Sequence, residues 1–586
     1  MPVLSRYDWI FALITIAFCA SAFGNGANDV ANSYATSVSA RTLTLPQVGL
    51  IAMCTEFVGA IALGSHVTKT IKGGIISMDR FEGKPGVLML AMACAEFGSA
   101  TWLIIATRFG LPVSTTQTIV GALVGVGLAS QAEISWEWKK GSVSQTAASW
   151  GIAPAISAGF AAVIFMILRL TVLDRKDPFK WALRLIPFYL SVTGAILALF
   201  IVIEAPTAPS LEEFGAGKAC GIVFGVLVGC LLLSYVFFVP YIHRRVVKGD
   251  TRVKFYHLPL GPLLWKENPP IYFPSKSNSA LIDYYENAHY EQEQTADQTH
   301  GSEVKSPAIV NPNSQSPDAT PYITADRVNV EKDPEAIMDA RLPGSAMDMP
   351  QQPKTRHIVT PRERFIEPVQ HLPKFHPQRL WGYFKFGFLH GVTVDAISHS
   401  SERVRKAHAK AKHYDNRVEH LWTYAQVVSA MMMSIAHGSN DVANAVGPWA
   451  ATYSTWQTST VDSEADTPPW MLAVAGILLG TGFWFFGYHV VRSMGNRITQ
   501  LSPTRGFSME LGAAITVMLA SRLGLPVSTT QCVVGSLIGV AICNGTLAAV
   551  NWRQVVFIFS GWVFTLPSAG LIAGLLFLMA VNTPHF

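Results

Sequence analysis

The sequence contains few charged residues. Asp, Glu, Lys and Arg make up 14% of its 586 residues, whereas a soluble globular protein carries about 25%. The shortage is concentrated in the two flanks, because most of the charge lies between His243 and His420. A charged side chain at the centre of a bilayer costs at least about 2.5 kcal/mol, so this distribution favours an integral membrane protein. The net charge of +5 gives no indication of nucleic-acid binding.

Other signatures are missing as well. The seven cysteines show no metal-ligand spacing such as CxxC, so we interpret them as small buried hydrophobic residues. Neither a nucleotide-binding loop nor a nucleophile–base constellation is present, which argues against an enzyme and against an ATP-driven machine. No basic segment precedes the first apolar run near Trp9, so we expect a membrane helix there and no cleaved signal peptide.

Apolar runs of about 20 residues, the length that spans a bilayer, occur on both sides of a polar middle. They lie near residues 9–40, 46–65, 86–107, 112–130, 148–168, 185–204 and 218–240, and near 422–452, 470–491, 507–522, 525–545 and 553–580. The pattern predicts an all-α membrane protein with about twelve transmembrane helices. The first and eighth runs contain polar and glycine residues and run 507–522 is short, which predicts broken or re-entrant segments.

The runs divide the chain into residues 1–243, a first membrane half, 244–420, a long hydrophilic segment, and 421–586, a second membrane half. Residues 268–353 are rich in Pro, Ser, Asn, Gln and acidic residues, a composition that predicts a largely disordered loop. Basic clusters near 174–180, 243–248 and 403–412 lie on one side if both termini are outside, so we expect the long loop in the cytoplasm. The basic residues within 69–84 disagree with this orientation.

Two motifs occur twice in the same order. The string NDVAN stands at 28–32 and 440–444, and GLPVSTTQ stands at 110–117 and 524–531. The first copies of their aspartate and serine are 85 positions apart and the second copies 87, and a glutamate precedes each serine by 18 positions. Seven runs lie before the second copy, so it enters the membrane from the opposite side. This is the inverted-repeat plan of secondary transporters, which places a binding site near the bilayer midplane.

The GLPVSTTQ motif is typical of a helix start, because Pro112 suits the first turn of a helix. The hydroxyls that follow stand beside unpaired backbone N–H groups and the positive end of the helix dipole, an arrangement that favours a phosphate group. Ordinary capping and interhelical packing are the alternative. The candidate phosphate-binding residues are Ser114, Thr115, Thr116, Gln117, Ser528, Thr529, Thr530 and Gln531.

The NDVAN motif places a carboxylate and two amides within an apolar run. Hard cations prefer such oxygen ligands, and a desolvated aspartate is costly unless it is paired or protonated. A sodium ion or a proton meets that need, and a structural hydrogen-bond network is the alternative. The candidate sodium ligands are Asn25, Asn28, Asp29, Asn32, Asn440, Asp441 and Asn444. In the second copy His437 replaces Asn25, and its imidazole introduces pH dependence.

Three further carboxylates, Glu56, Glu96 and Glu510, lie within apolar runs, and bound cations between them and an anion would explain co-transport. Glu56 is aligned with Leu479 and so has no acidic counterpart. Arg108 and Arg522 each precede their serine by six positions. They are candidates for pairing with the anion, although arginines at helix ends usually extend to the interface.

At these motifs the sequence resembles the inorganic phosphate transporter (PiT) family, and in particular the sodium–phosphate symporters of fungal plasma membranes. The strings GANDVANSYATSVSARTLTLPQ and GSNDVANAVG and both copies of GLPVSTTQ carry the resemblance, and the polar middle adds nothing to it. The resemblance implies sodium-coupled phosphate uptake by alternating access, without a cofactor, in a homodimer. It assigns cation coupling to Asp29 and Asp441, phosphate binding to the Ser-Thr-Thr segments, and a role in transport to the three glutamates.

Four other functions remain open from the sequence. The nearest is a proton-coupled phosphate symporter, and the next is a carrier of another tetrahedral oxyanion such as sulfate. An anion channel disagrees with the buried carboxylates and the repeat. A nutrient sensor that signals through the long loop is the fourth.

Overall fold

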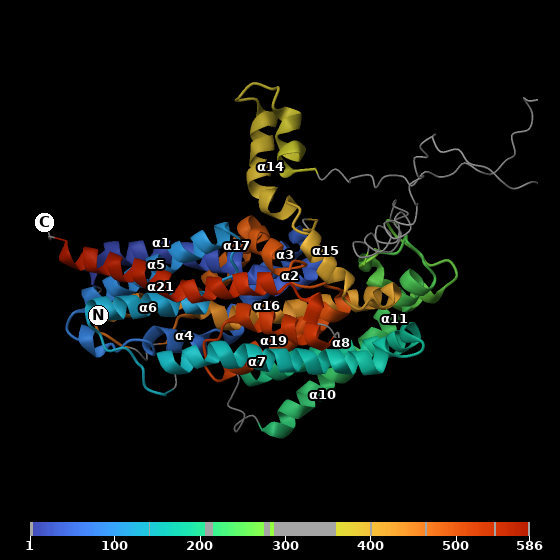
Figure 1. Cartoon of the computed structure of the whole chain (residues 1–586), viewed down its shortest axis with the longest axis horizontal. Helices are drawn as coiled ribbons and strands as arrows, with labels where there is room; N and C mark the ends of the chain where they lie inside the picture. The colour runs from blue at the N-terminus through green and yellow to red at the C-terminus, as the bar shows by residue number, and fades with distance from the viewer. Residues whose placement is uncertain are drawn as a thin grey trace, which may run out of the picture. The chain divides into compact units, whose positions relative to one another are not determined.

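The computed structural model describes residues 4–139, 141–204, 215–274, 282–285, 359–398, 401–462, 466–543 and 547–583 (Figure 1). One compact unit comprises Met1–Gln292 and Thr360–Phe586, and a second comprises Glu293–Val359. Almost all of the second unit lies outside the described residues, and so does most of the loop predicted to be disordered. The described part of the first unit is nearly all helical and contains no named strand, which confirms the predicted all-α class.

A helix coincides with every predicted apolar run. In the first half these are α1 Asp8–Asn25 with α2 Ala31–Ser39, α3 Leu45–Leu63, α5 Pro85–Arg108, α6 Thr115–Ser130, α7 Val143–Leu168, α8 Pro178–Glu204 and α10 Ala216–Leu233. In the second half they are α16 Asn416–Thr458, α17 Pro469–Phe486, α19 Pro503–Arg522, α20 Thr529–Cys543 and α21 Trp552–Asn582. The shorter helices α4 Ser65–Gly73, α11 Val239–Ile242 and α18 Tyr488–Met494 connect them.

Not all of these helices have the length and composition of a membrane span. Eight helical stretches of the described chain are long and apolar enough to cross a bilayer. Helices α6 and α20 are apolar but have only 16 and 15 residues. Helices α16 and α19 have 43 and 20 residues but are not among the eight. Helix α16 carries the polar residues of NDVAN, and α19 carries the charged residues Arg505, Glu510 and Arg522. The figure of twelve crossings therefore stays a prediction.

Of the three predicted interruptions, the structure shows one. The first run is interrupted by a π-helical turn, η2 Gly26–Val30, between α1 and α2. The eighth run contains no break, because α16 continues as one α-helix through its copy of NDVAN. Run 507–522 is not short either, since α19 begins at Pro503. Helices α6 and α20 instead start in the interior, just after the buried Ser114 and Ser528.

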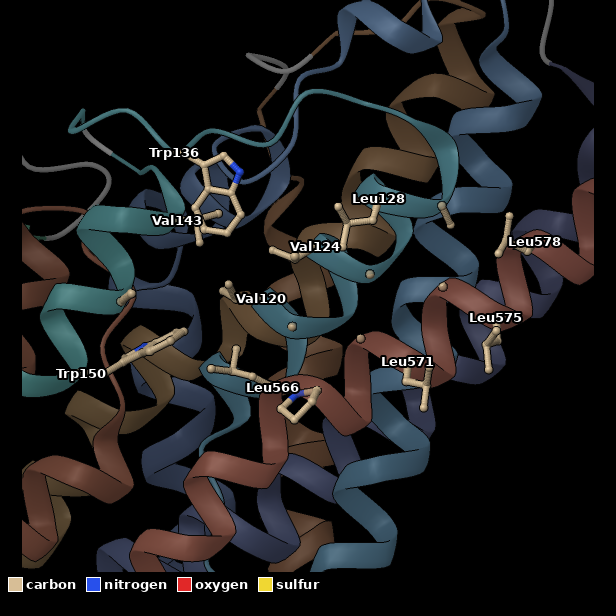
Figure 2. A pocket seen from close by; sticks show the side chains of 17 residues that line it. Val120, Val124, Leu128, Trp136, Val143, Trp150, Leu566, Leu571, Leu575 and Leu578 are labelled. Carbon is tan, nitrogen blue, oxygen red and sulfur yellow. The ribbon is translucent and has the colours of Figure 1, made fainter.

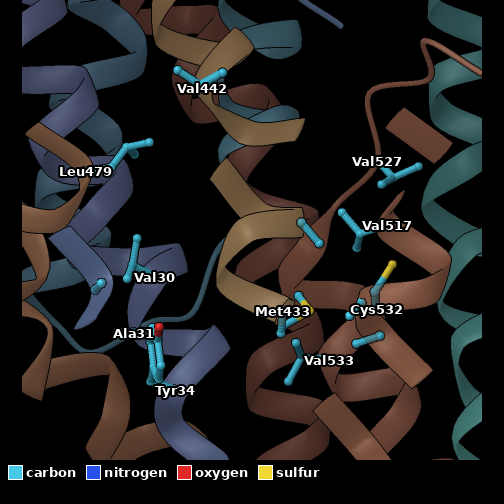
Figure 3. Packing of buried hydrophobic residues seen from close by; sticks show 14 of the residues in the cluster. Val30, Ala31, Tyr34, Met433, Val442, Leu479, Val517, Val527, Cys532 and Val533 are labelled. Atoms are coloured by element: carbon cyan, nitrogen blue, oxygen red, sulfur yellow. The ribbon is translucent and has the colours of Figure 1, made fainter. Parts of the chain in front are cut away.

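The helices of the two halves are interleaved. Helix α7 packs against α19 and α20, α21 packs against α5 and α6, and α3 packs against α16 and α17. Figure 3 shows the same mixing in the core, where Val30 and Tyr34 of the first half lie near Leu479 of the second. The buried hydrophobic residues of both halves form one large cluster. Neither half therefore has a core of its own.

The described end of the hydrophilic segment forms α13 Pro361–Phe365, α14 Pro377–Thr393 and α15 Glu402–Ala409. Helix α14 ends against α17, where Gly391 lies so close to the backbone of Phe485 that a Cβ would be 2.3 Å from its carbonyl oxygen. His408 attaches α15 to the segment after α18, because its ring nitrogen forms a hydrogen bond with the Asn496 carbonyl oxygen at 2.7 Å. Burial lowers the pKa of His408 to about 4, so this histidine is neutral at physiological pH.

Candidate functional site

A large groove of about 770 Å³ lies between α6, α7 and α21 and is lined by apolar residues (Figure 2). Its seventeen lining residues are all apolar, among them Val120, Leu128, Trp150, Leu571 and Leu578. An ion or a hydrophilic anion would lose its hydration there without gaining partners. The candidate site is therefore the buried polar cluster formed by the repeated motifs.

Every predicted site residue is buried. Each is at most 5% exposed, although the set comes from eight α-helices, from the π-helical turn η2 and from the non-helical segments before α6 and α20. Buried polar groups are costly unless they bond one another or a ligand. The partners of each group in this cluster therefore indicate which atoms hold the fold together and which are left for a ligand.

Two left-handed glycines shape the approach to the cluster. Gly110 and Gly524 both have a φ of +66°, a conformation that glycine adopts without strain. In each copy the next residue, Leu111 or Leu525, donates its N–H to a carbonyl five residues back at 2.9 Å, which closes α5 or α19. The chain then turns back into the interior as a short extended segment.

The asparagine that precedes each aspartate holds this extended segment. The Asn28 side chain accepts from the Val113 N–H at 3.1 Å and donates to the Leu111 carbonyl at 3.0 Å. Asn440 makes the same pair of contacts with Val527 and Leu525, both at 3.2 Å. These two predicted sodium ligands thus position the helix starts, and each keeps a second lone pair on its amide oxygen.

The aspartates receive hydrogen bonds from the threonines at the helix starts. Asp29 accepts from the Thr115 hydroxyl at 2.6 Å, from the Thr115 N–H at 3.3 Å and from the Thr530 hydroxyl at 2.7 Å. Asp441 accepts from the Thr529 hydroxyl at 2.5 Å. The first donors of helices α6 and α20 are therefore occupied by carboxylates of the NDVAN motifs.

Contacts between the two copies join them into one site. Asn32 donates to the Thr530 hydroxyl at 2.6 Å, and Asn444 donates to the Thr116 hydroxyl at 3.1 Å. Thr116 in turn donates to the Val527 carbonyl at 2.9 Å. The NDVAN motif of each half thus bonds the GLPVSTTQ motif of the other half as well as its own.

Several buried acceptor atoms of the described cluster have no hydrogen-bond partner. They are the side-chain amide oxygens of Asn25, Asn32, Asn444, Gln117 and Gln531. Ser114 and Ser528 cap their helices by accepting from the Gln117 and Gln531 N–H groups at 3.2 and 3.3 Å, so their hydroxyl hydrogens remain for a further acceptor. The cluster therefore offers free acceptors beside the aspartates and free hydroxyl donors at the helix starts.

The repeated glutamates have very different surroundings. Glu510 accepts hydrogen bonds from Thr36, Ser37 and Ser429 at 2.6 Å each, and from Gln426 at 3.2 Å. Glu96 is equally buried but has fewer partners: among the described residues neither carboxyl oxygen accepts a hydrogen bond of good geometry, and the Ser21 hydroxyl is the polar group that acts on it. The motif spacing predicted equivalent roles for the two glutamates, and their contacts differ.

Glu56 belongs to an interaction that the sequence did not reveal. Its carboxylate lies 2.7 Å from Nδ1 of His437 and accepts from the Ser434 hydroxyl at 2.5 Å. The other ring nitrogen of His437 lies 3.1 Å from Asp441. His437 is thus part of the cluster, and the only sequence signal for it was its place opposite Asn25 in the repeat.

Arg108 and Arg522 do not reach the cluster. Both are exposed at the ends of α5 and α19. Their exposure fits arginines that extend to the interface.

The fold and the cluster define a class of protein: a membrane protein of many helices whose two halves enclose a duplicated, buried polar site. The model of the phosphate transporter family, PHO4, matches residues 25–573. The phosphate-repressible phosphate permease pho-4 of Neurospora crassa is 36% identical over 100% of this chain and 99% of its own length. The chain belongs to the phosphate transporter family, whose members are transporters and not enzymes.

Two other comparisons agree with this family. Sodium-dependent phosphate transporter 1-A of Danio rerio is 27% identical over 93% of this chain and 90% of its own. A solved structure described as the sodium-dependent phosphate transporter matches with a TM-score of 0.62 and 24% identity, over 98% of this chain and 100% of that one. This structural likeness shows a shared fold.

Proposed function

We propose that the chain carries inorganic phosphate into the cell together with sodium ions, by alternating access between its two halves. One observation carries the choice of sodium: the amide oxygens of Asn25, Asn32 and Asn444 have no partner and stand in the motifs of Asp29 and Asp441. Hard cations take such oxygen ligands. Animal relatives named as sodium-dependent phosphate transporters support the same choice.

Phosphate is assigned to the starts of α6 and α20. The residues are Ser114, Thr115, Thr116 and Gln117 with Ser528, Thr529, Thr530 and Gln531. Hydroxyls and helix N-termini bind anions, and the free oxygens of Gln117 and Gln531 accept a hydrogen bond from a protonated phosphate oxygen. Sodium is assigned to Asn25, Asn28, Asp29 and Asn32, and to Asn440, Asp441 and Asn444.

The shared donors provide a mechanism of coupling. Without a cation, Asp29 holds the hydroxyl and N–H of Thr115, and Asp441 holds the hydroxyl of Thr529. A sodium ion on each carboxylate compensates its charge and weakens these hydrogen bonds, since both need the same oxygen lone pairs. The threonine donors are then free for phosphate, so sodium binding prepares the anion site.

The matching contacts of Asn28 with Asn440 and of Asp29 with Asp441 support two inverted repeats. We include in the proposal twelve crossings, a plasma-membrane location with the loop of residues 244–420 cytoplasmic and both termini outside, and a homodimer. Glu56, Glu96 and Glu510 serve as coupling carboxylates.

Phosphate uptake into proteoliposomes tests the function. We expect accumulation above equilibrium under an inward sodium gradient without a proton gradient, and its collapse when sodium is dissipated. The contact between Glu56 and His437 favours a second candidate, proton coupling. Accumulation only under an inward proton gradient would replace sodium by protons, and no accumulation under either gradient would overturn the proposed function.

A further inference from the structure

The contact between Glu56 and His437 has no equivalent in the other copy of the repeat. An added Cβ on Gly438 would lie 2.7 Å from the carbonyl oxygen of Glu56, and one on Gly26 would lie 1.8 Å from that of Leu479. Glu56 and Leu479 therefore occupy matching places. One side of the site carries a carboxylate and an imidazole, and the matching side carries Leu479 and Asn25.

The Glu56 carboxylate fixes the orientation and the tautomer of the His437 ring. An ionised carboxylate only accepts hydrogen bonds, and Glu56 lies 2.7 Å from Nδ1 while its other oxygen accepts from Ser434. The ring proton is therefore on Nδ1. In the neutral ring, Nε2 then directs a lone pair at the Asp441 carboxylate, 3.1 Å away. Two electron-rich atoms at this distance require a cation or a proton between them.

The groups around Nε2 form a set of metal ligands. One ligand atom each from Asp29, His437 and Asp441 lie within 4.8 Å of one another. His437 is fully buried with its Nε2 facing the Asp441 carboxylate, and the amide oxygen of Asn444 has no hydrogen-bond partner. Sodium prefers oxygen ligands, whereas zinc and cobalt bind imidazole nitrogen together with carboxylates. A carboxylate on the far nitrogen of the ring is the usual support of a metal-binding histidine.

We propose that His437, Asp441 and Asp29 bind a divalent transition-metal ion of the zinc or cobalt type, in competition with sodium. The ion links α16 to the turn η2 of the other half, and so opposes any separation of these two segments during the proposed alternating access. Binding itself depends only on the geometry of this cluster. The competition with sodium and the inhibition of uptake rest on the proposed function.

A titration of the purified full-length protein with Co²⁺ in sodium-free buffer tests the binding. We expect one ion per chain, detected by the visible absorption of bound Co²⁺, and its displacement by Zn²⁺ and by high sodium. His437→Asn, which restores the residue of the first copy, should weaken Co²⁺ binding at least tenfold. Glu56→Gln removes the support of the ring and should weaken it about 10–100-fold. His489→Asn is the control, because that histidine lies outside the cluster.

X-ray absorption of the zinc-loaded wild-type protein makes the test independent of how the variants fold. A nitrogen ligand in the zinc shell is expected, and a shell of oxygen alone would overturn the proposal. Equal Co²⁺ affinity of the wild type and His437→Asn would overturn it too, and would leave the Glu56–His437 pair as a proton site. Sodium-driven uptake in chelator-treated buffer reports on the proposed function separately, since failure there leaves the binding result intact.

Discussion

The two copies of the site share the hydrogen bonds that hold their helix starts in place. They differ in the buried carboxylates that surround these helix starts. Asn28 and Asn440 hold their extended segments with the same pair of backbone contacts, and each aspartate bonds the threonine at its own helix start. The carboxylates around this frame do not match, because Glu510 is fully bonded, Glu96 is not, and Glu56 has no counterpart. The repeat therefore duplicates the contacts that hold the helix starts in place, but not the surroundings of the buried carboxylates.

Removing either aspartate tests whether the copies are equivalent in transport. Asp29→Asn and Asp441→Asn keep the size of the side chain but remove the charge on which the proposed cation sites depend. We expect each to lower sodium-driven phosphate uptake at least about 100-fold, equivalent to about 2.7 kcal/mol, with normal amounts of protein in the membrane. Initial rates in proteoliposomes measure this. Normal uptake by either variant would remove that aspartate from the mechanism.

The glycines before the aspartates test whether the copies pack equally tightly. The Cβ of Gly26→Ala would lie 1.8 Å from the Leu479 carbonyl oxygen, and that of Gly438→Ala 2.7 Å from the Glu56 oxygen. Because the obstacle is backbone in both cases, we expect losses of stability at or above the upper end of the usual 1–3 kcal/mol, with the greater loss for Gly26. Thermal unfolding in detergent measures this. Gly151→Ala, with nothing within 4 Å of the added atom, should leave the midpoint unchanged.

Substitution of Glu510 and Glu96 tests whether their different hydrogen bonding affects stability. Glu510→Gln weakens four hydrogen bonds to a carboxylate, so we expect a loss of about 1–3 kcal/mol. Glu96→Gln exchanges one buried, weakly bonded group for another and should change stability by less than about 0.5 kcal/mol. Unfolding midpoints of the two variants, measured in parallel, give the comparison. Equal losses of stability would mean that the two carboxylates contribute equally to the fold despite their different contacts.

The serines at the helix starts should have a moderate effect on phosphate binding. Ser114→Ala combined with Ser528→Ala removes two hydroxyl donors from the anion site and two helix caps. We expect the KM for phosphate to rise about tenfold, about 1.4 kcal/mol, with little change in maximal rate. Concentration series of labelled phosphate measure both constants. An unchanged KM would place the anion elsewhere than at these helix starts.

Much of this architecture can be read from the sequence, because hydrophobicity and repetition are local signals. Each predicted apolar run coincides with a helix, and the spacing of NDVAN and GLPVSTTQ identified most of the residues that form the cluster. Contacts between the halves have no such signal. The bond from Asn32 to Thr530 joins residues 498 positions apart, and Glu56 has no acidic partner in the repeat that would have revealed its contact with His437. The four partners of Glu510 are ordinary polar residues until the fold brings them together.

The sequence predicted the interruption of the first run but also one in the eighth run, which the structure does not show. The first copy of NDVAN begins in a π-helical turn and ends in α2, whereas the second copy lies in an uninterrupted α-helix. The five letters are identical, so their neighbours decide the difference. Packing of the whole bundle, and not local propensity, determines where a helix in this protein loosens.

The interleaving of the two halves has a consequence for biosynthesis. The amide of Asn25 donates to the backbone of Asp441, 416 residues later in the chain. At about 5–20 residues per second, a ribosome needs roughly 20–80 s to synthesise the stretch between them. During that interval Asn25 is in or near the membrane without its final partner, and Asp29 lacks the hydrogen bond from Thr530. The first half must therefore be protected, by the insertion machinery or by delayed entry into lipid, until α16 is made.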